Sequence, residues 1–225
     1  MTKFFITSTG TGIGKTLVTT SLCWQLRQSG ENVTALKPII SGYDAADMSN
    51  DSAQILQSCG IEPSAAEQER ISPWRYKAPL APNMAAAREG NPVDLAALVA
   101  FCKSQTAEML LVEGVGGIMA PLNAQHTVLD WMSALNWPVL LVAGSYLGAI
   151  SHTLSADEVL RAKNLPIRAV IVSESRDSGV SLADTVDTLK KFLPRAIPVV
   201  ELPVLNTKEA LWKDAPPLSW LCQNL

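Results

Sequence analysis

Strand-sized apolar runs alternate with helix-like patterns along most of the chain. This alternation is typical of a parallel sheet, because parallel strands need a crossover helix between them and are covered on both faces. We therefore predict an α/β fold with one mostly parallel sheet flanked by helices on both faces. The predicted strands cover residues 3–8, 32–37, 108–113, 138–143, 167–172 and 197–202. The predicted helices cover residues 15–29, 93–105, 127–136, 151–164 and 181–192.

Residues 60–92 fit neither pattern and are rich in Pro, Ala and Glu. We expect them to form an irregular excursion, and a long excursion of this kind in a compact domain is often functional. The chain has no internal repeat and no low-complexity linker, and 225 residues lie within the range of one α/β domain. The sequence therefore predicts a single domain over residues 1–225.

Composition argues against several classes of function. The chain is 48% hydrophobic and 17% charged, which is typical of a globular protein. The net charge is −3, whereas proteins that bind nucleic acids usually carry an excess of positive charge. The longest apolar runs are strand-sized, the first residues do not resemble a signal peptide, and the four cysteines never fall in C-x-x-C spacing. We expect a cytoplasmic protein that binds neither nucleic acid nor membrane.

The stretch STGTGIGKT, residues 8–16, follows the first predicted strand and opens the first predicted helix. Its glycines remove side chains that would keep backbone N–H groups from converging on an anion. Lys15 can reach bound phosphates, and the Thr16 hydroxyl can bind magnesium. The usual pattern G-x-x-x-x-G-K-[ST] has glycine where this chain has Thr9. We interpret the stretch as a mononucleotide loop in a P-loop nucleotide-hydrolase-like fold; a glycine-rich turn with a solvated lysine is the alternative.

Two further charged residues close predicted strands. Lys37 ends the second strand in ALKPIISG, and Glu113 ends the strand 108–113 in VEGVGG. Ligands of open parallel sheets bind beyond the carboxyl ends of the strands, so both residues are expected near Lys15. Two lysines suit a polyanion, and a carboxylate after an apolar strand is costly to bury unless a metal or other cation pairs with it. The glycines after Glu113 suggest close approach by a ligand. Solvated strand ends are the alternative.

Asp51 has two possible roles. Followed by Gln54 in DSAQ, it resembles the first residue of a helix capping box. It could also be a metal ligand, and the two roles are compatible.

Taken together, these motifs resemble the dethiobiotin synthetase family. The GKT loop, KPIISG (37–42), an acidic helix start, VEGVGG (112–117) and VLLVAGSYLGAISH (139–152) occur in that family's order over residues 4 to about 205. The resemblance implies an ATP-dependent cyclo-ligase of biotin biosynthesis that uses Mg2+. One amine of 7,8-diaminononanoate would take up CO2 as a carbamate, which accepts the γ-phosphoryl group of ATP. The second amine would then attack and expel phosphate.

The resemblance also implies roles for single residues. Lys15 and Lys37 would be catalytic, and Thr16, Asp51 and Glu113 would hold the metal. The implied nucleotide-binding residues are Gly12, Ile13, Gly14, Lys15, Thr16, Leu17, Asp51, Glu113, Gly114, Val115, Gly116, Ser173, Glu174, Pro203, Val204 and Leu205. The implied substrate-binding residues are Thr11, Ser41, Gly148 and Ser151. Family members are homodimers in which residues around 145–152 complete the partner's substrate site.

The chain departs from the family pattern where base and substrate contacts are expected, and at two positions in the loop. The departures are Ser8, Gly12, Ala81-Pro82-Asn83, Ser151, and Ser173-Glu174 in place of an adenine-binding asparagine. They leave open a degenerate paralogue that binds nucleotide without making dethiobiotin. A partitioning-type ATPase is a further alternative, although its defining lysine would fall at Gly10.

Overall fold

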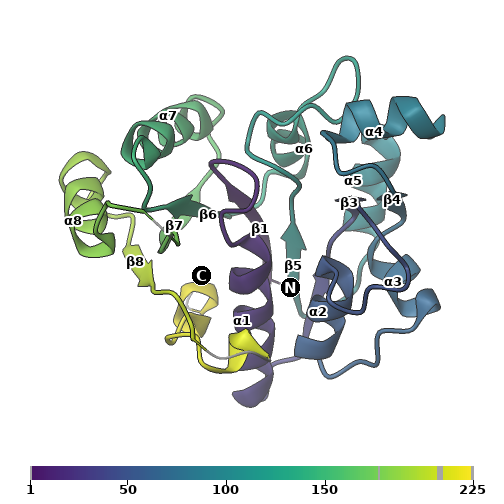
Figure 1. The fold of residues 1–225 in the computed structure, drawn as a ribbon, viewed down its shortest axis with the longest axis horizontal. Coiled ribbons are helices and arrows are strands. Elements are labelled where there is room, and N and C mark those ends of the chain that lie inside the picture. The colour runs from purple at the N-terminus through teal and green to yellow at the C-terminus, as the bar shows by residue number, and fades with distance from the viewer. Residues whose placement is uncertain (1, 177, 207–209, 224–225) are drawn as a thin grey trace.

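A six-stranded sheet, parallel throughout, forms the centre of the protein (Figure 1). The computed structural model describes residues 2–176, 178–206 and 210–223. The strand order is β2-β5-β1-β6-β7-β8, so the chain starts in the middle of the sheet and builds outward to both edges. The strands are β1 (Thr2–Ser8), β2 (Val33–Leu36), β5 (Met109–Glu113), β6 (Val139–Gly144), β7 (Ile167–Ser173) and β8 (Val199–Leu202).

Helices cover both faces of this sheet. The α-helices are α1 (Lys15–Gln28), α2 (Asp51–Ser58), α3 (Ala65–Ile71), α4 (Pro82–Glu89), α5 (Leu95–Lys103), α6 (Val128–Leu135), α7 (Ala149–Ala162) and α8 (Leu182–Phe192). Right-handed crossovers put α1, which carries the chain from β1 to β2, opposite to α6, α7 and α8, which carry it the other way. Accordingly α1 packs against α2 and the short carboxyl-terminal helices η1 (Leu211–Lys213) and η2 (Ser219–Cys222), whereas α7 packs against α8 (Figure 1).

The predicted α/β fold is confirmed, and every predicted strand is present within two residues of its predicted ends. The expectation for residues 60–92 was wrong in part. This excursion contains α3, α4 and a short strand, β4 (Trp74–Tyr76), which pairs in parallel with β3 (Ile39–Ser41) in a separate two-stranded sheet. Three-residue strands are too short to show a period in the sequence, so only their pairing reveals them.

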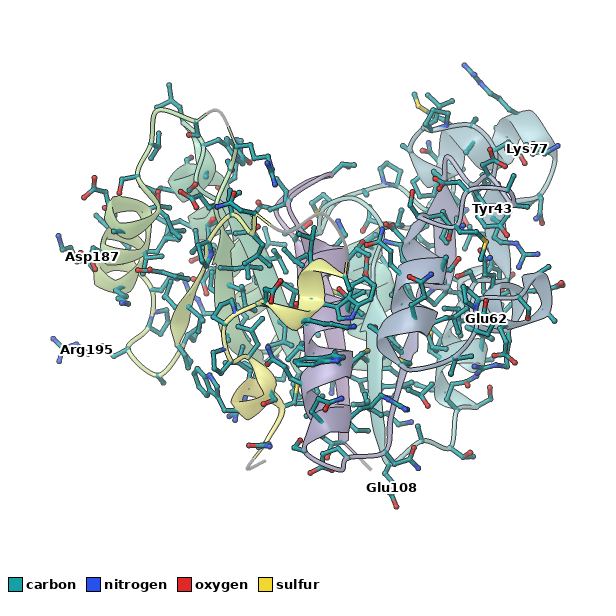
Figure 2. All side chains as sticks on the ribbon, turned by 60° about the horizontal axis from the view of Figure 1, so that its bottom comes forward. Tyr43, Glu62, Lys77, Glu108, Asp187 and Arg195 are labelled. Atoms are coloured by element: carbon teal, nitrogen blue, oxygen red, sulfur yellow. The ribbon has the colours of Figure 1, made fainter. Side chains whose placement is uncertain are left out.

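The apolar core lies on both faces of the central strands. Every residue of β5 and β6 is buried, as expected for parallel strands covered by helices. Phe5 of β1 meets Trp131 of α6 edge to face, with ring centroids 4.7 Å apart. Charged side chains such as Asp187 and Arg195 point outward (Figure 2). Within the described residues, no helix has the length and apolar character needed to span a membrane.

The start of α6 offers a test of local stability. The Thr127 backbone N–H and hydroxyl donate to Asp130 Oδ2 at 2.7 and 2.9 Å, and the backbone hydrogen bond lowers the pKa of Asp130. We predict that Asp130→Ala lowers the free energy of unfolding by about 1 kcal/mol at pH 7. A depressed carboxyl pKa stabilises the fold only while the group is ionised. The difference from wild type should therefore shrink below about pH 4. Urea unfolding of both proteins across pH measures this, and a pH-independent difference would contradict it.

Candidate active site

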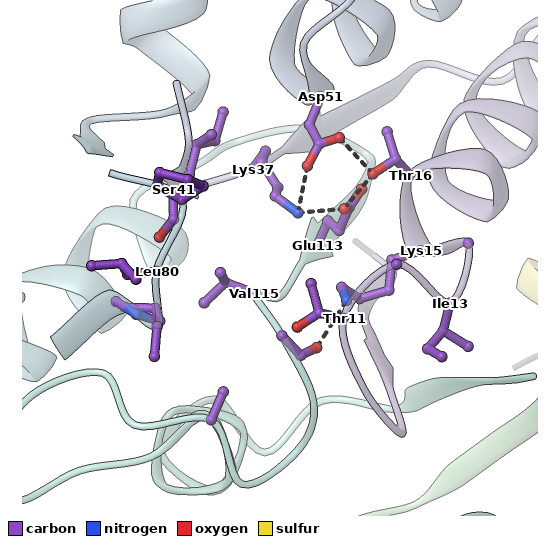
Figure 3. A pocket seen from close by; sticks show the side chains of 18 residues that line it. Thr11, Ile13, Lys15, Thr16, Lys37, Ser41, Asp51, Leu80, Glu113 and Val115 are labelled. Carbon is purple, nitrogen blue, oxygen red and sulfur yellow. Dashed lines mark hydrogen bonds and ion pairs between the residues drawn. The ribbon is translucent and has the colours of Figure 1, made fainter. Parts of the chain in front are cut away.

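A cavity of about 770 Å³ opens at the carboxyl ends of β1, β2 and β5 (Figure 3). This is the edge at which an open parallel sheet binds its ligands. The cavity brings together segments that are far apart in the sequence. Its lining consists of Thr11, Gly12, Ile13, Gly14, Lys15, Thr16, Lys37, Ile40, Ser41, Asp51, Pro79, Leu80, Ala81, Pro82, Glu113, Val115, Gly116 and Ala120.

The predicted phosphate loop connects β1 to α1, as a mononucleotide loop requires. Gly14 precedes the first helical residue with φ of 104°, a conformation that favours glycine. A Cβ atom at Gly14 would also lie 2.8 Å from Ser173 Oγ, so a side chain at this position would displace the Ser173 side chain. The amino terminus of α1 therefore faces the cavity with bare backbone N–H groups, which attract an anion.

Lys15 is held by neutral oxygen atoms. Its Nζ donates to Gly116 O at 2.8 Å, to Ser8 Oγ at 3.0 Å and to Gly10 O at 3.3 Å. Burial, with the repulsion of Lys37, lowers the pKa of Lys15 to about 8. The ammonium group therefore remains mainly charged at neutral pH, without a carboxylate as a direct hydrogen-bond partner among these contacts, and can bind a phosphate.

Strand register explains the position of Lys37. Leu36 pairs with Val112, so Lys37 falls opposite Glu113 at the ends of neighbouring strands. Lys37 Nζ lies 2.5 Å from Glu113 Oε1, 3.1 Å from Asp51 Oδ2 and 3.1 Å from Gly114 O (Figure 3). Burial opposes a charge on Lys37, but the attraction of Glu113 and Asp51 outweighs it and raises the pKa of Lys37. Lys37 is thus a buried ammonium ion held by two carboxylates.

Asp51 is not a helix cap, which corrects the capping-box prediction. Asn50 is the N-cap of α2, and its Oδ1 accepts from Ala53 N at 3.0 Å. Gln54 Nε2 donates to Ser49 O. Asp51 is the first helical residue, and its carboxylate turns into the cavity toward Lys37 (Figure 3). Although burial alone would raise the pKa of Asp51, the attraction of Lys37 lowers it.

The three predicted metal ligands lie together. Thr16 Oγ1 is 3.0 Å from Asp51 Oδ1 and 2.9 Å from Glu113 Oε1. The other carboxylate oxygen of Glu113, Oε2, is buried and accepts no hydrogen bond from the described residues. Across those same residues, no three His, Cys, Asp or Glu side chains form a metal-binding group. Two carboxylates and a hydroxyl are hard oxygen donors, a set that fits a hard divalent cation also bound by waters and phosphates.

Two of the glycines after Glu113, Gly114 and Gly117, accommodate the protein's own chain, whereas Gly116 lines the cavity in which a ligand was predicted to approach. A Cβ atom at Gly114 would lie 2.9 Å from the Phe5 ring, and one at Gly117 would lie 3.2 Å from Thr9 O and Gly10 N. Ile118 N donates to Ser8 O at 3.1 Å. Gly117 and Ile118 are therefore packed against the backbone of the phosphate loop, whereas Gly114 is packed against β1.

The remaining predicted residues fall into three groups. Thr11, Ser41 and Val115 line the cavity, together with Gly12, Ile13, Gly14 and Gly116. The predicted base-binding residues do not line it. Ser173 ends β7, and the others follow β7 or β8, where Glu174 Oε2 accepts from Val204 N at 2.8 Å. Gly148 and Ser151 are exposed at the start of α7, also away from this cavity.

Several lining residues were missed by the sequence analysis. Ile40, Pro79 and Leu80 give one wall of the cavity apolar character. Ser8 was noted only as a departure, although its hydroxyl contacts Lys15. Pro79 and Leu80 lie in the excursion 60–92, which was expected to be functional, but no pattern in it singled them out.

Residues 2–207 match the model of a family described as an AAA domain. Among solved structures, chloroplast FtsY from Physcomitrella patens covers 98% of this chain with a TM-score of 0.54 at 16% identity. The signal recognition particle receptor FtsY from Elizabethkingia anophelis covers 93% with a TM-score of 0.52, also at 16% identity. This chain spans 64% and 61% of the length of those two chains, respectively. At such identity the likeness concerns the fold alone.

Fold and cavity together define a P-loop nucleotide-binding protein. A curated relative from Methylobacterium nodulans, an ATP-dependent dethiobiotin synthetase BioD, is 47% identical over 78% of this chain and 82% of its own. Relatives of the same name from Acidiphilium cryptum and Caulobacter sp. are 42% and 46% identical, over 89% and 87% of this chain and 92% and 86% of their own. The chain belongs to the ATP-dependent dethiobiotin synthetase family.

The close backbone packing at Gly117 generates a prediction. Gly117→Ala should lower the free energy of unfolding by about 1–3 kcal/mol, because backbone on the facing loop cannot yield easily to a new Cβ. Displacement of the loop should also weaken Mg-ATP binding by at least about fivefold, equivalent to about 1 kcal/mol. Urea unfolding and titration calorimetry measure both quantities. Gly179→Ala is the matched control, because its Cβ would meet no atom within 4 Å. Equal behaviour of the two variants would contradict the steric account.

Proposed function

We propose that this protein is a dethiobiotin synthetase, which converts 7,8-diaminononanoate, CO2 and ATP into dethiobiotin, ADP and phosphate. The observation that carries the proposal is the convergence of Lys15, Lys37 and the Thr16-Asp51-Glu113 set on one cavity. Relatives that bear this name cover most of the chain. The proposed reaction proceeds through a carbamate and its mixed anhydride with phosphate.

Phosphoryl transfer depends on positioning and on neutralising charge, so no covalent nucleophile is required of the protein. Backbone N–H groups at the start of α1 would bind the phosphates, and Lys15 would exchange its carbonyl partners for phosphate oxygens. Lys37 enters the cavity from the end of β2 and would face the carbamate and the γ-phosphate. Both roles support the transfer because each lysine carries a positive charge toward the reacting groups.

Thr16, Asp51 and Glu113 would hold Mg2+, a cation that suits these oxygen donors. When bound, Mg2+ neutralises charge on the triphosphate. The buried Glu113 Oε2, which has no hydrogen-bond partner among the described residues, supports a cation at this place.

The substrate side of the cavity supports a diamine with an alkyl chain. Ile40, Pro79 and Leu80 form an apolar wall, and the Ser41 hydroxyl is buried there with no hydrogen-bond partner in the described part of the chain. An unpaired buried hydroxyl is costly, so a substrate group that pairs with it gains affinity. Thr11 lies on the loop side of the same cavity.

A homodimer belongs to the same proposal. Leu147, beside Gly148, is 90% exposed, and Met119 is 54% exposed. A contiguous patch of exposed apolar side chains is typical of a surface that binds a partner, and these two residues would contribute to such a patch. A second copy seated here would bring Ser151 toward a substrate. A cytoplasmic location, without nucleic-acid or membrane partners, completes the proposal.

Incubation with diaminononanoate, bicarbonate, Mg2+ and ATP, followed by mass spectrometry for dethiobiotin, tests the activity. We predict that Lys15→Ala and Lys37→Ala each lower turnover by at least about 100-fold, because each removes a charge that stabilises the transition state. Arg195 is exposed and precedes β8, at the amino end of that strand, whereas the cavity lies at the carboxyl ends of the strands. Arg195→Ala should therefore keep the wild-type rate. Circular dichroism checks that each variant folds. A lysine variant with near-wild-type turnover would remove that lysine from the mechanism. Nucleotide binding without product would favour a degenerate paralogue.

Base selection gives a separate prediction. Ser173 stands where an adenine-binding asparagine is expected, and one oxygen of the Glu174 carboxylate is already bonded to Val204 N. We expect CTP or GTP to support the reaction within about tenfold of ATP, a difference of about 1.4 kcal/mol. Initial rates with each nucleotide at matched concentration measure this. A preference for ATP far above tenfold would show that other groups recognise adenine.

A further inference from the structure

The two lysines of the cavity are held by different kinds of partner. Lys15 donates to a hydroxyl and two carbonyl oxygens. Lys37 forms ion pairs with both Asp51 and Glu113, at 3.1 and 2.5 Å. A triphosphate replaces neutral partners of Lys15 without freeing a buried charge. By contrast, Lys37 can leave its partners only if another cation takes its place, because unpaired buried carboxylates are strongly unfavourable.

We propose that Lys37 and the divalent cation compete for the same two carboxylates, so that binding of the cation releases the Lys37 ammonium group into the cavity. This inference rests on the metal site of the proposed function. It assigns Lys37 a second role as the internal counter-ion of Asp51 and Glu113.

The contacts of the carboxylates define the competition. Glu113 Oε1 is shared by Lys37 Nζ and Thr16 Oγ1, whereas Glu113 Oε2 is free of hydrogen bonds from the described residues. Asp51 instead uses a different oxygen for each partner, with Oδ1 on Thr16 and Oδ2 on Lys37. Any cation bound beside Thr16 is therefore within a few ångströms of the Lys37 charge. The two cations repel each other strongly at that separation in a partly buried site.

Lys37 has a side chain that can respond. Its remaining hydrogen bond is to Gly114 O at 3.1 Å, a neutral acceptor that does not compensate for the loss of both carboxylates. The ammonium group is carried on a flexible four-carbon stem. Ser41 and Ile40 follow closely in the chain and line the same cavity. Released Lys37 would thus reach an acidic substrate group only after the cation is bound, which gives the site an order of assembly.

Binding of Mn2+ to the nucleotide-free protein tests the proposal without any turnover. Electron paramagnetic resonance gives the free Mn2+ concentration for wild type, Lys37→Met and Lys15→Met. Removal of the competing charge should tighten Mn2+ binding by Lys37→Met at least about tenfold. Lys15→Met is the matched control. It removes a cation of the same cavity that bonds to neither carboxylate, so its Mn2+ affinity should stay within about threefold of wild type.

A second variant covers loss of folding. Lys37→Gln removes the charge but keeps a hydrogen-bond donor for Glu113, and it should also bind Mn2+ more tightly than wild type. If Lys37→Met folds only when Mn2+ is added, as judged by circular dichroism, that result supports the same conclusion.

Three results would overturn the proposal: equal Mn2+ affinity of wild type and both Lys37 variants, equal tightening by Lys15→Met, or no Mn2+ binding by any variant. Failure of the proposed function would appear separately, as absence of dethiobiotin in the turnover assay. Tight Mn2+ binding by Lys37→Met together with an inactive wild-type protein would therefore keep the competition and reject the reaction.

Discussion

The site depends on a carboxylate that is completely buried at the end of a central strand. Glu113 has no exposed surface, and it closes β5 between the strands that lead to the phosphate loop and to Lys37. A buried negative charge requires a cation nearby, so the neighbouring elements must bring one to this point. Lys37 does so from the next strand. The same need for positive charge makes the place suitable for a metal ion.

Mutual packing of two loops keeps this electrostatic arrangement in position. The phosphate loop and the segment 114–118 touch through backbone atoms, and Gly116 O accepts a hydrogen bond from Lys15 Nζ at 2.8 Å. A lysine on one loop is therefore positioned by a carbonyl group of the other. Rigid support of this kind suits catalysis of phosphoryl transfer, which depends on the accurate placement of charges.

The order of the sheet explains why residues distant in the sequence meet. Because β5 lies between β1 and β2, the carboxyl ends of these three strands converge, and each supplies or leads into a functional residue. The excursion 60–92 closes the other side of the cavity. Its hydrogen bond from Lys37 N to Ile71 O, at 3.2 Å, fixes it to the edge of the sheet. The sequence did not predict the short elements α3, β4 and α4, since their positions depend on contacts with distant segments.

The amino-acid sequence alone determined the α/β fold, the phosphate loop and the charged strand ends at Lys37 and Glu113. These features depend on local pattern and on the general geometry of parallel sheets. Only the tertiary structure decided the partner of Asp51, since Asn50 caps the helix and leaves the Asp51 carboxylate free to pair with Lys37. It likewise decided that Gly117 accommodates the backbone of the phosphate loop. A sequence pattern names the residues able to carry charge or permit close packing, whereas their partners are set by contacts between segments far apart in the chain.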